Sequence, residues 1–175
     1  MAEQAGGLTV DVLIEISMGT KHKYEYDDRY NRLRLDRVLF TPSVYPANYG
    51  YLPDTLAPDG DALDVLVLTN DPVIPGCLVT ARVLGMLAMH DAGREDFKIL
   101  AVEHSDPTLD DYRVLEDVPP NTLRQIAMFF ATYKKLEGGE TSVGGWQGFD
   151  AVAALIERCR KAFVQSDGPA ITRRS

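Results

Sequence analysis

The sequence predicts an α+β fold that is mainly β, with a curled antiparallel sheet or small barrel flanked by two helices near the C-terminus. Two observations lead to this prediction. Apolar residues alternate with period two in the first half of the chain, which is typical of strands with one buried face. Towards the C-terminus they recur at steps of three and four residues, which is typical of amphipathic helices. We expect one domain over residues 1–175, with loose ends at about 1–7 and 165–175.

The first strand candidates lie before residue 40. Residues 10–16 read Val-x-Val-x-Ile-x-Ile, which predicts a half-buried strand with Glu15 on its opposite face. A second strand carries Lys23 and Glu25 on one face, because they are two residues apart. Residues 33–37 alternate again and predict a third strand.

Proline, tyrosine, asparagine and glycine are frequent in residues 41–59, which predicts an ordered loop rather than a helix. Long ordered loops are often functional. Residues 65–68, 78–89 and 97–103 are rich in Val, Leu and Ile, and they predict three further strands.

Two helices are expected in the remainder. The first follows the start signal Pro119-Pro120-Asn121 and carries an apolar stripe of Leu123, Ile126, Phe130, Tyr133 and either Leu136 or Glu137. Asp150 is the predicted cap of the second, whose stripe is Val152, Leu155, Ile156, Cys159 and Phe163.

Charge and composition exclude several protein classes. The formal net charge of -8 argues against nucleic-acid binding, which normally rests on clustered Lys and Arg, but it does not argue against a small phosphate ligand. The chain has no apolar run near the roughly 20 residues of a membrane helix, and its start lacks the order of a signal peptide. We therefore expect a cytoplasmic protein. Cys77 and Cys159 fall at apolar positions and are expected to be free thiols, without a zinc site.

The strongest local signal is the triplet Asp59, Asp61 and Asp64 before an apolar strand. An acidic turn of this kind is often only solvated. Converging carboxylates need a cation, and oxygen-rich sites suit Mg²⁺ or Mn²⁺. An EF-hand starting at Asp59 fails, because Asp64 and Asn70 stand where Gly and Glu are required. Residues 91–98 form a second acidic turn, which alone would be an ordinary hairpin loop.

Seven segments extend this signal along the chain: Ile-Glu-Ile at 14–16, Lys-Tyr-Glu at 23–25, Leu-Asp-Arg at 35–37, Tyr-Pro-x-Asn-Tyr-Gly-Tyr at 45–51, the triplet at 59–64, the turn at 91–98, and Phe-Phe-x-x-Tyr-Lys-x-Leu-Glu at 129–137. In this order and spacing the chain resembles the type I soluble inorganic pyrophosphatases from Ile14 to about Phe163. The resemblance implies a small closed OB-like five-stranded barrel. It also implies hydrolysis of pyrophosphate to two orthophosphates by direct attack of a metal-bridging water or hydroxide.

The resemblance assigns roles residue by residue. Several Mg²⁺ ions per site, with Mn²⁺ or Zn²⁺ as substitutes, would be held by Asp59, Asp64, Asp91, Asp96 and, largely through water, Glu25. Asp61 would take the proton of the attacking water, with Tyr49 hydrogen-bonding nearby. The phosphate ligands would be Lys23, Arg37, Tyr49, Lys98, Tyr133 and Lys134. Glu15 and Lys98 would form a supporting ionic pair at the site rim, and Tyr45 would support the loop.

The resemblance further implies a homo-oligomer, a hexamer as in the bacterial members, with no nucleic-acid or membrane partner. The chain departs from the family pattern at Ala62, where Pro is usual, and at Glu140 and Ser142, where relatives commonly carry lysines. Two alternatives are a catalytically altered protein with the same fold and a non-enzymatic OB-like binding domain. The acidic balance opposes the binding domain, and the retained site residues oppose the altered protein.

Overall fold

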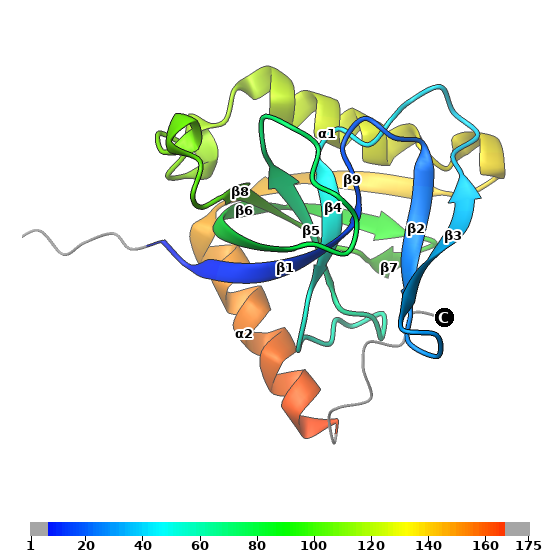
Figure 1. Ribbon diagram of the computed structural model, residues 1–175, viewed down its shortest axis with the longest axis horizontal. Helices are drawn as coiled ribbons and strands as arrows, with labels where there is room; N and C mark the ends of the chain where they lie inside the picture. Colours follow the sequence, from blue (N-terminus) through cyan, green and yellow to red (C-terminus); the bar gives the residue numbers. More distant parts are fainter. Residues whose placement is uncertain (1–6, 167–175) are drawn as a thin grey trace, which may run out of the picture.

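Five strands close into a hydrogen-bonded ring in the computed structural model, which describes residues 7–166 (Figure 1). In ring order they are β1 (Thr9–Ile16), β4 (Asn48–Leu52), β5 (Leu63–Leu68), β8 (Lys98–Glu103) and β6 (Leu78–Asp91), which returns to β1. The pairing of β5 with β8 is parallel, and the others are antiparallel. The prediction of a mainly β fold with a five-stranded near-barrel is confirmed.

The other strands of the described chain lie outside this ring. A separate two-stranded sheet is formed by β2 (His22–Asp27) and β3 (Arg32–Val38). Two further strands pair with β6, namely β7 (Arg94–Glu95) and β9 (Thr141–Gln147).

The two predicted helices are α1 (Pro120–Thr132) and α2 (Phe149–Gln165), which lie on different sides of the ring (Figure 1). Three short 3₁₀ turns are η1 (Pro107–Leu109), η2 (Leu115–Asp117) and η3 (Lys135–Glu137). The expected loose ends fall mainly outside the described residues, and α2 runs to Gln165. In the described part of the chain, no helix combines the length and apolar character needed to cross a bilayer.

Strands β4 and β9 were not predicted from the sequence. The segment 41–59 holds β4, whose five residues are all buried, so that no period-two pattern marks it. Its Gly50 lies so close to β1 that a Cβ there would overlap the carbonyl oxygen of Leu13. The glycine-rich segment 138–145 enters β9, because the long strand β6 offers hydrogen-bonding partners along Met86–Asp91.

Both helix boundaries also differ from the prediction. Helix α1 ends at Thr132, with Tyr133 as its C-cap, and Leu136 of the predicted stripe is exposed in η3. The N-cap of α2 is Gly148, so the prediction of Asp150 as the cap is wrong. Asp150 lies instead in the first turn, where the positive end of the helix dipole stabilises a carboxylate.

Alternate residues of the ring strand β5 pack into two different hydrophobic clusters. Leu66 packs in a cluster that includes Phe129 and Phe130 of α1, whereas Val65 and Val67 pack in a cluster that includes the buried face of α2. Both faces of β5 are therefore buried, which explains why its sequence is a continuous apolar run. The thiols of Cys77 and Cys159 are free, as predicted.

Candidate functional site

The centre of the candidate site is the ammonium group of Lys98, which is only 3% exposed. The parallel register of β5 and β8 places Lys98 opposite Asp64. Its Nζ donates hydrogen bonds of 2.6 Å to Asp64 Oδ2, 2.6 Å to Asp96 Oδ1 and 3.2 Å to the Tyr49 hydroxyl. It also lies 5.5 Å from the centroid of the Phe130 ring. One buried cation thus joins two of the predicted metal ligands to a predicted catalytic tyrosine.

Charge in this cluster is unevenly balanced. Burial alone would lower the pKa of Lys98, but Asp64, Tyr49 and Asp96 raise that pKa well above its ordinary value. The ammonium group therefore stays charged. Burial raises the pKa of Asp96, and Asp64 adds to this rise while Lys98 opposes it. One ammonium group shared by two carboxylates leaves an excess of negative charge that suits a further cation.

Two members of the acidic triplet, Asp59 and Asp61, lie in the loop that joins β4 to β5, and the third, Asp64, lies in β5. The backbone N–H of Asp61 donates to Asp59 Oδ1 at 3.1 Å, and the carbonyl oxygen of Asp61 accepts from Ala57 N at 2.7 Å. Asp59 is exposed, and Asp61 is half-buried. These two hydrogen bonds, one from the backbone N–H and one to the carbonyl oxygen of Asp61, hold the loop in a defined shape before β5 begins.

Asp91 ends β6 at a two-residue turn that leads into β7. Ala92 and Gly93 both have positive φ, 49° and 79°, as a tight hairpin turn requires. Asp91 accepts an ion-paired hydrogen bond from Lys134, which follows α1. Burial would lower the pKa of Lys134, but Tyr133 and Asp91 raise it above its ordinary value. The acidic turn is an ordinary hairpin in its backbone, as predicted, with a lysine brought against it.

The two-stranded sheet carries a second charged cluster. Lys23 pairs with Glu25 on β2 and lies 3.5 Å from Asp36 Oδ2 on β3. Arg37 is opposite Lys23 in the register of the two strands, and its Nη1 donates to Asp36 Oδ2 at 2.8 Å. Lys23 and Arg37, both predicted phosphate ligands, are therefore neighbours.

Aromatic side chains connect these clusters to the core. Tyr45 packs against Tyr49 and Phe129, with ring centroids 5.5 Å and 4.9 Å apart, and Phe129 stacks on Tyr133 at 5.4 Å. Burial raises the pKa of the Tyr45 and Tyr133 hydroxyl groups above their ordinary value. Both phenols are neutral at physiological pH and can donate hydrogen bonds.

Glu15 and Lys98, which were predicted to form a supporting ionic pair, both lie at buried positions. Glu15 is fully buried, and its Oε1 accepts a 2.9 Å hydrogen bond from the backbone N–H of Tyr26. Lys98, its expected partner, forms ion pairs with Asp64 and Asp96. Both residues are buried, whereas their pair was expected at the site rim. The buried carboxylate of Glu15 ties β2 to β1.

The predicted metal ligands do not all converge. Within residues 7–166, no group of three or more His, Cys, Asp and Glu side chains has an arrangement that could hold a metal ion. Asp64 and Asp96 meet at Lys98, whereas Asp91 and Glu25 each face a different lysine. Each of these carboxylates thus lies beside an ammonium group, and Asp64 and Asp96 share a single one.

Two acidic residues that received no individual role from the sequence lie against Arg37. These are Asp36 and Glu137, both within the motif segments 35–37 and 129–137. Their position inside those segments is the only sequence signal that could have indicated a role.

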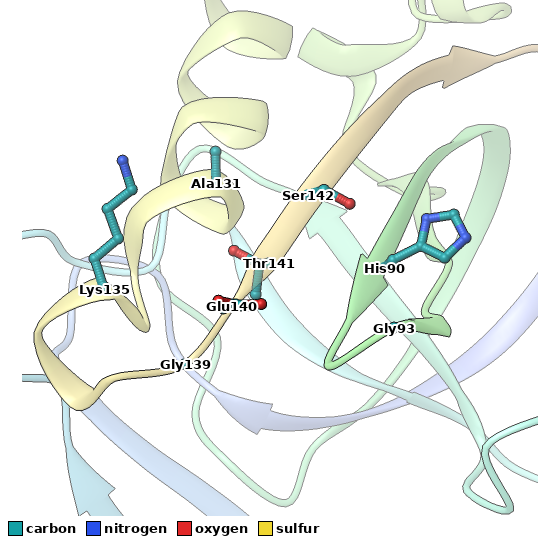
Figure 2. A pocket seen from close by; sticks show the side chains of 8 residues that line it. All are labelled: His90, Gly93, Ala131, Lys135, Gly139, Glu140, Thr141 and Ser142. Carbon is teal, nitrogen blue, oxygen red and sulfur yellow. The ribbon is translucent and has the colours of Figure 1, made fainter.

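A pocket of about 600 Å³ adjoins the site beside β9. Figure 2 shows Glu140, Thr141 and Ser142 between His90 on one side and Lys135 on the other. Two of the three departures from the family pattern, Glu140 and Ser142, therefore line this pocket together.

Comparisons with known proteins cover almost the whole chain. Residues 12–164 match the family model described as inorganic pyrophosphatase. The inorganic pyrophosphatase of Geobacillus stearothermophilus is 49% identical over 150 residues, which are 86% of this chain and 91% of that protein. That of Synechocystis is 46% identical over 162 residues, covering 93% and 95%. The crystal structure of inorganic pyrophosphatase from Thermus thermophilus matches with a TM-score of 0.87 at 38% identity, covering 93% of this chain and 95% of that one.

Proposed function

The chain belongs to the inorganic pyrophosphatase family, and from this premise we propose how its own residues divide the hydrolysis of pyrophosphate. It is an inorganic diphosphatase, which converts pyrophosphate to two orthophosphates. The observation that carries the proposed mechanism is the buried cluster in which Lys98 joins Asp64, Asp96 and Tyr49. This cluster lies at the start of β5 and β8, next to the loop that presents Asp61.

Divalent metal fits the donor chemistry of this site. The proposed ligands offer only carboxylate oxygens, which suit Mg²⁺ and, as substitutes, Mn²⁺ or Zn²⁺. Asp64 and Asp96 already direct oxygen atoms at one shared positive centre, and the negative charge around Lys98 exceeds one ammonium group. When bound, divalent metal neutralises phosphate charge and lowers the pKa of water. The proposed ligands are Asp59, Asp64, Asp91, Asp96 and Glu25.

Asp61 is the proposed general base. Its carboxylate accepts a proton from the attacking water, while the water oxygen forms a bond to one phosphorus and the bridging P–O bond breaks. The electron pair of the broken bond stays on the second phosphate, so two orthophosphates leave. In this proposal the Tyr49 hydroxyl, which accepts from Lys98, hydrogen-bonds near the attacking water.

Cationic side chains and one phenol bind the substrate in this proposal. Arg37 presents a planar fork that can hold phosphate oxygens in pairs, whereas Lys23 and Lys134 act as point charges. The neutral hydroxyl of Tyr133 donates a hydrogen bond, since burial raises its pKa. Lys98 orients Tyr49 and stabilises the carboxylates. These groups offset the charge that builds up on the phosphate oxygens in the transition state.

The test of this function is phosphate release from pyrophosphate by the purified chain, with EDTA and with millimolar Mg²⁺. Fast release that requires Mg²⁺ is expected. No release with Mg²⁺, Mn²⁺ or Zn²⁺ would favour a catalytically altered protein with the family fold. A homohexamer in the cytoplasm is also part of the proposal, and light scattering coupled to gel filtration measures the assembly.

Arg37→Ala and Lys134→Ala are each expected to raise KM for pyrophosphate about 10- to 100-fold, because a charged hydrogen bond contributes about 1.5–3 kcal/mol. Calorimetric Mg²⁺ binding without substrate should change much less. Lys161→Ala on the outer face of α2 is the control, since Lys161 is exposed and pairs only with Glu157 among the described ion pairs. Equal losses of Mg²⁺ and pyrophosphate binding would contradict the assignment.

A further inference from the structure

Glu137 connects two parts of the site that are far apart in the sequence. It ends η3, directly after the segment that carries Tyr133 and Lys134. Its Oε2 lies 2.9 Å from Nε of Arg37 on β3. The Glu137 side chain is 14% exposed and that of Arg37 is 29% exposed. A partly buried charge pair therefore joins the two-stranded sheet to the segment after α1.

The guanidinium group of Arg37 lies between two carboxylates. Nη1 donates to Asp36 at 2.8 Å, while Nε faces Glu137 in an ion pair that is not aligned as a hydrogen bond. A guanidinium group has five N–H donors, so contacts on two edges fix its plane and leave donors for phosphate. The pKa of Arg37, which burial alone would lower, is raised by Glu137 and Asp36.

The position of Glu137 is itself fixed by its backbone. Its N–H donates to the carbonyl oxygen of Lys134 at 3.0 Å, and Gly139 N donates to the same oxygen at 3.1 Å. Gly138 closes the turn in the left-handed region, with φ of 76°. Glu137 and Lys134 are therefore held in one short, tightly bonded turn.

The sheet that carries Arg37 needs such a connection. Strands β2 and β3 pair with each other and lie outside the sheet that contains the ring. Side-chain contacts must then set their position, and two are the hydrogen bond from Tyr26 N to Glu15 and the ion pair between Arg37 and Glu137. The second of these acts directly on a proposed phosphate ligand.

We propose that Glu137 is a positioning residue for pyrophosphate binding, which holds the Arg37 guanidinium group in register with Lys134 and Tyr133. This inference rests on the proposed role of Arg37 as a phosphate ligand. Glu137 acts through Arg37 and does not touch the substrate. Its loss affects substrate binding more than the chemical step, because Asp61 and its loop keep their own contacts.

The test is a double-mutant cycle on Glu137 and Arg37. Glu137→Gln preserves size and removes charge, and it is expected to raise KM about tenfold, since displaced positioning groups cost up to about 10²-fold. The value of kcat should stay within about twofold. In an Arg37→Ala background, Glu137→Gln should have no further effect on KM. Glu157→Gln, which breaks the exposed pair with Lys161, is the matched control and should leave KM unchanged.

The outcomes separate this inference from the function on which it rests. An unchanged KM in Arg37→Ala alone would refute the role of Arg37. If Arg37→Ala raises KM but Glu137→Gln has no effect, or the same effect in both backgrounds, the positioning role is wrong. Glu137→Asp, which keeps the charge on a shorter side chain, should give an intermediate KM. A urea unfolding curve for each variant shows whether a loss of folding accounts for any change.

Discussion

Asp61→Asn is expected to lower kcat for pyrophosphate hydrolysis by about 10²–10⁴-fold, the usual contribution of a general base. Asparagine has nearly the same shape as aspartate, and the backbone contacts of this loop to Asp59 and Ala57 do not involve the Asp61 side chain. The loop should therefore keep its shape while the proton acceptor is lost. Steady-state phosphate release gives kcat, and calorimetry gives Mg²⁺ affinity, which should be largely retained.

The matched control is Asp54→Asn in the same connection. Asp54 is exposed and has a positive φ of 57°, a conformation that asparagine also tolerates. The Asp54→Asn variant should leave kcat unchanged. Near wild-type turnover in Asp61→Asn would show that another group takes the proton. Loss of Mg²⁺ binding in step with kcat would instead indicate that Asp61 acts as a metal ligand.

The second large effect concerns stability. Lys98→Met is expected to lower the free energy of unfolding by about 3–5 kcal/mol in EDTA, because removing one partner of a buried ion pair leaves uncompensated charge. Asp64 and Asp96, with side chains 14% and 13% exposed, would lose the ammonium group that both contact. Methionine fills a similar volume, so packing against Phe130 is largely kept. Urea unfolding measures the loss.

Magnesium should restore part of this stability, because a divalent cation can compensate the same two carboxylates. An equal loss in EDTA and in saturating Mg²⁺ would therefore refute their role as metal ligands. Lys161→Met is the control, since its pair with Glu157 is exposed and such pairs contribute about 0.2–1 kcal/mol. A loss below about 1 kcal/mol in Lys98→Met would show that the buried cluster is not strongly coupled.

The sequence pattern predicted the elements that have one exposed face. The alternation at residues 10–16 gave β1 its correct boundaries to within one residue at the N-terminal end, and the stripes of α1 and α2 located both helices. Strands β4 and β9 were missed for different reasons. Burial on both faces removes the alternation of β4, and the glycines of β9 remove the side chains that would show it.

The candidate site could be predicted from the sequence mainly through its motif segments. Local spacing indicated the acidic triplet and the hairpin turn, because their residues are neighbours in the chain. The contact of Lys98 with Asp64 was different, since it depends on the parallel register that sets Asp64 opposite Lys98. Spacing within one segment contains no information about pairing between distant strands. The same reason hid the contact between Arg37 and Glu137.

Closure of the ring also bears on how this chain avoids aggregation through exposed strand edges. Each ring strand has a hydrogen-bonded neighbour on both sides, so very apolar segments such as Leu63–Leu68 present no open edge to another molecule. Open edges in the described chain belong to the outer strands. There β2 and β3 alternate charged side chains along their length, and β9 contains two consecutive glycines. The segments with the strongest tendency to form intermolecular β-structure are thus the ones that the topology withholds from solvent.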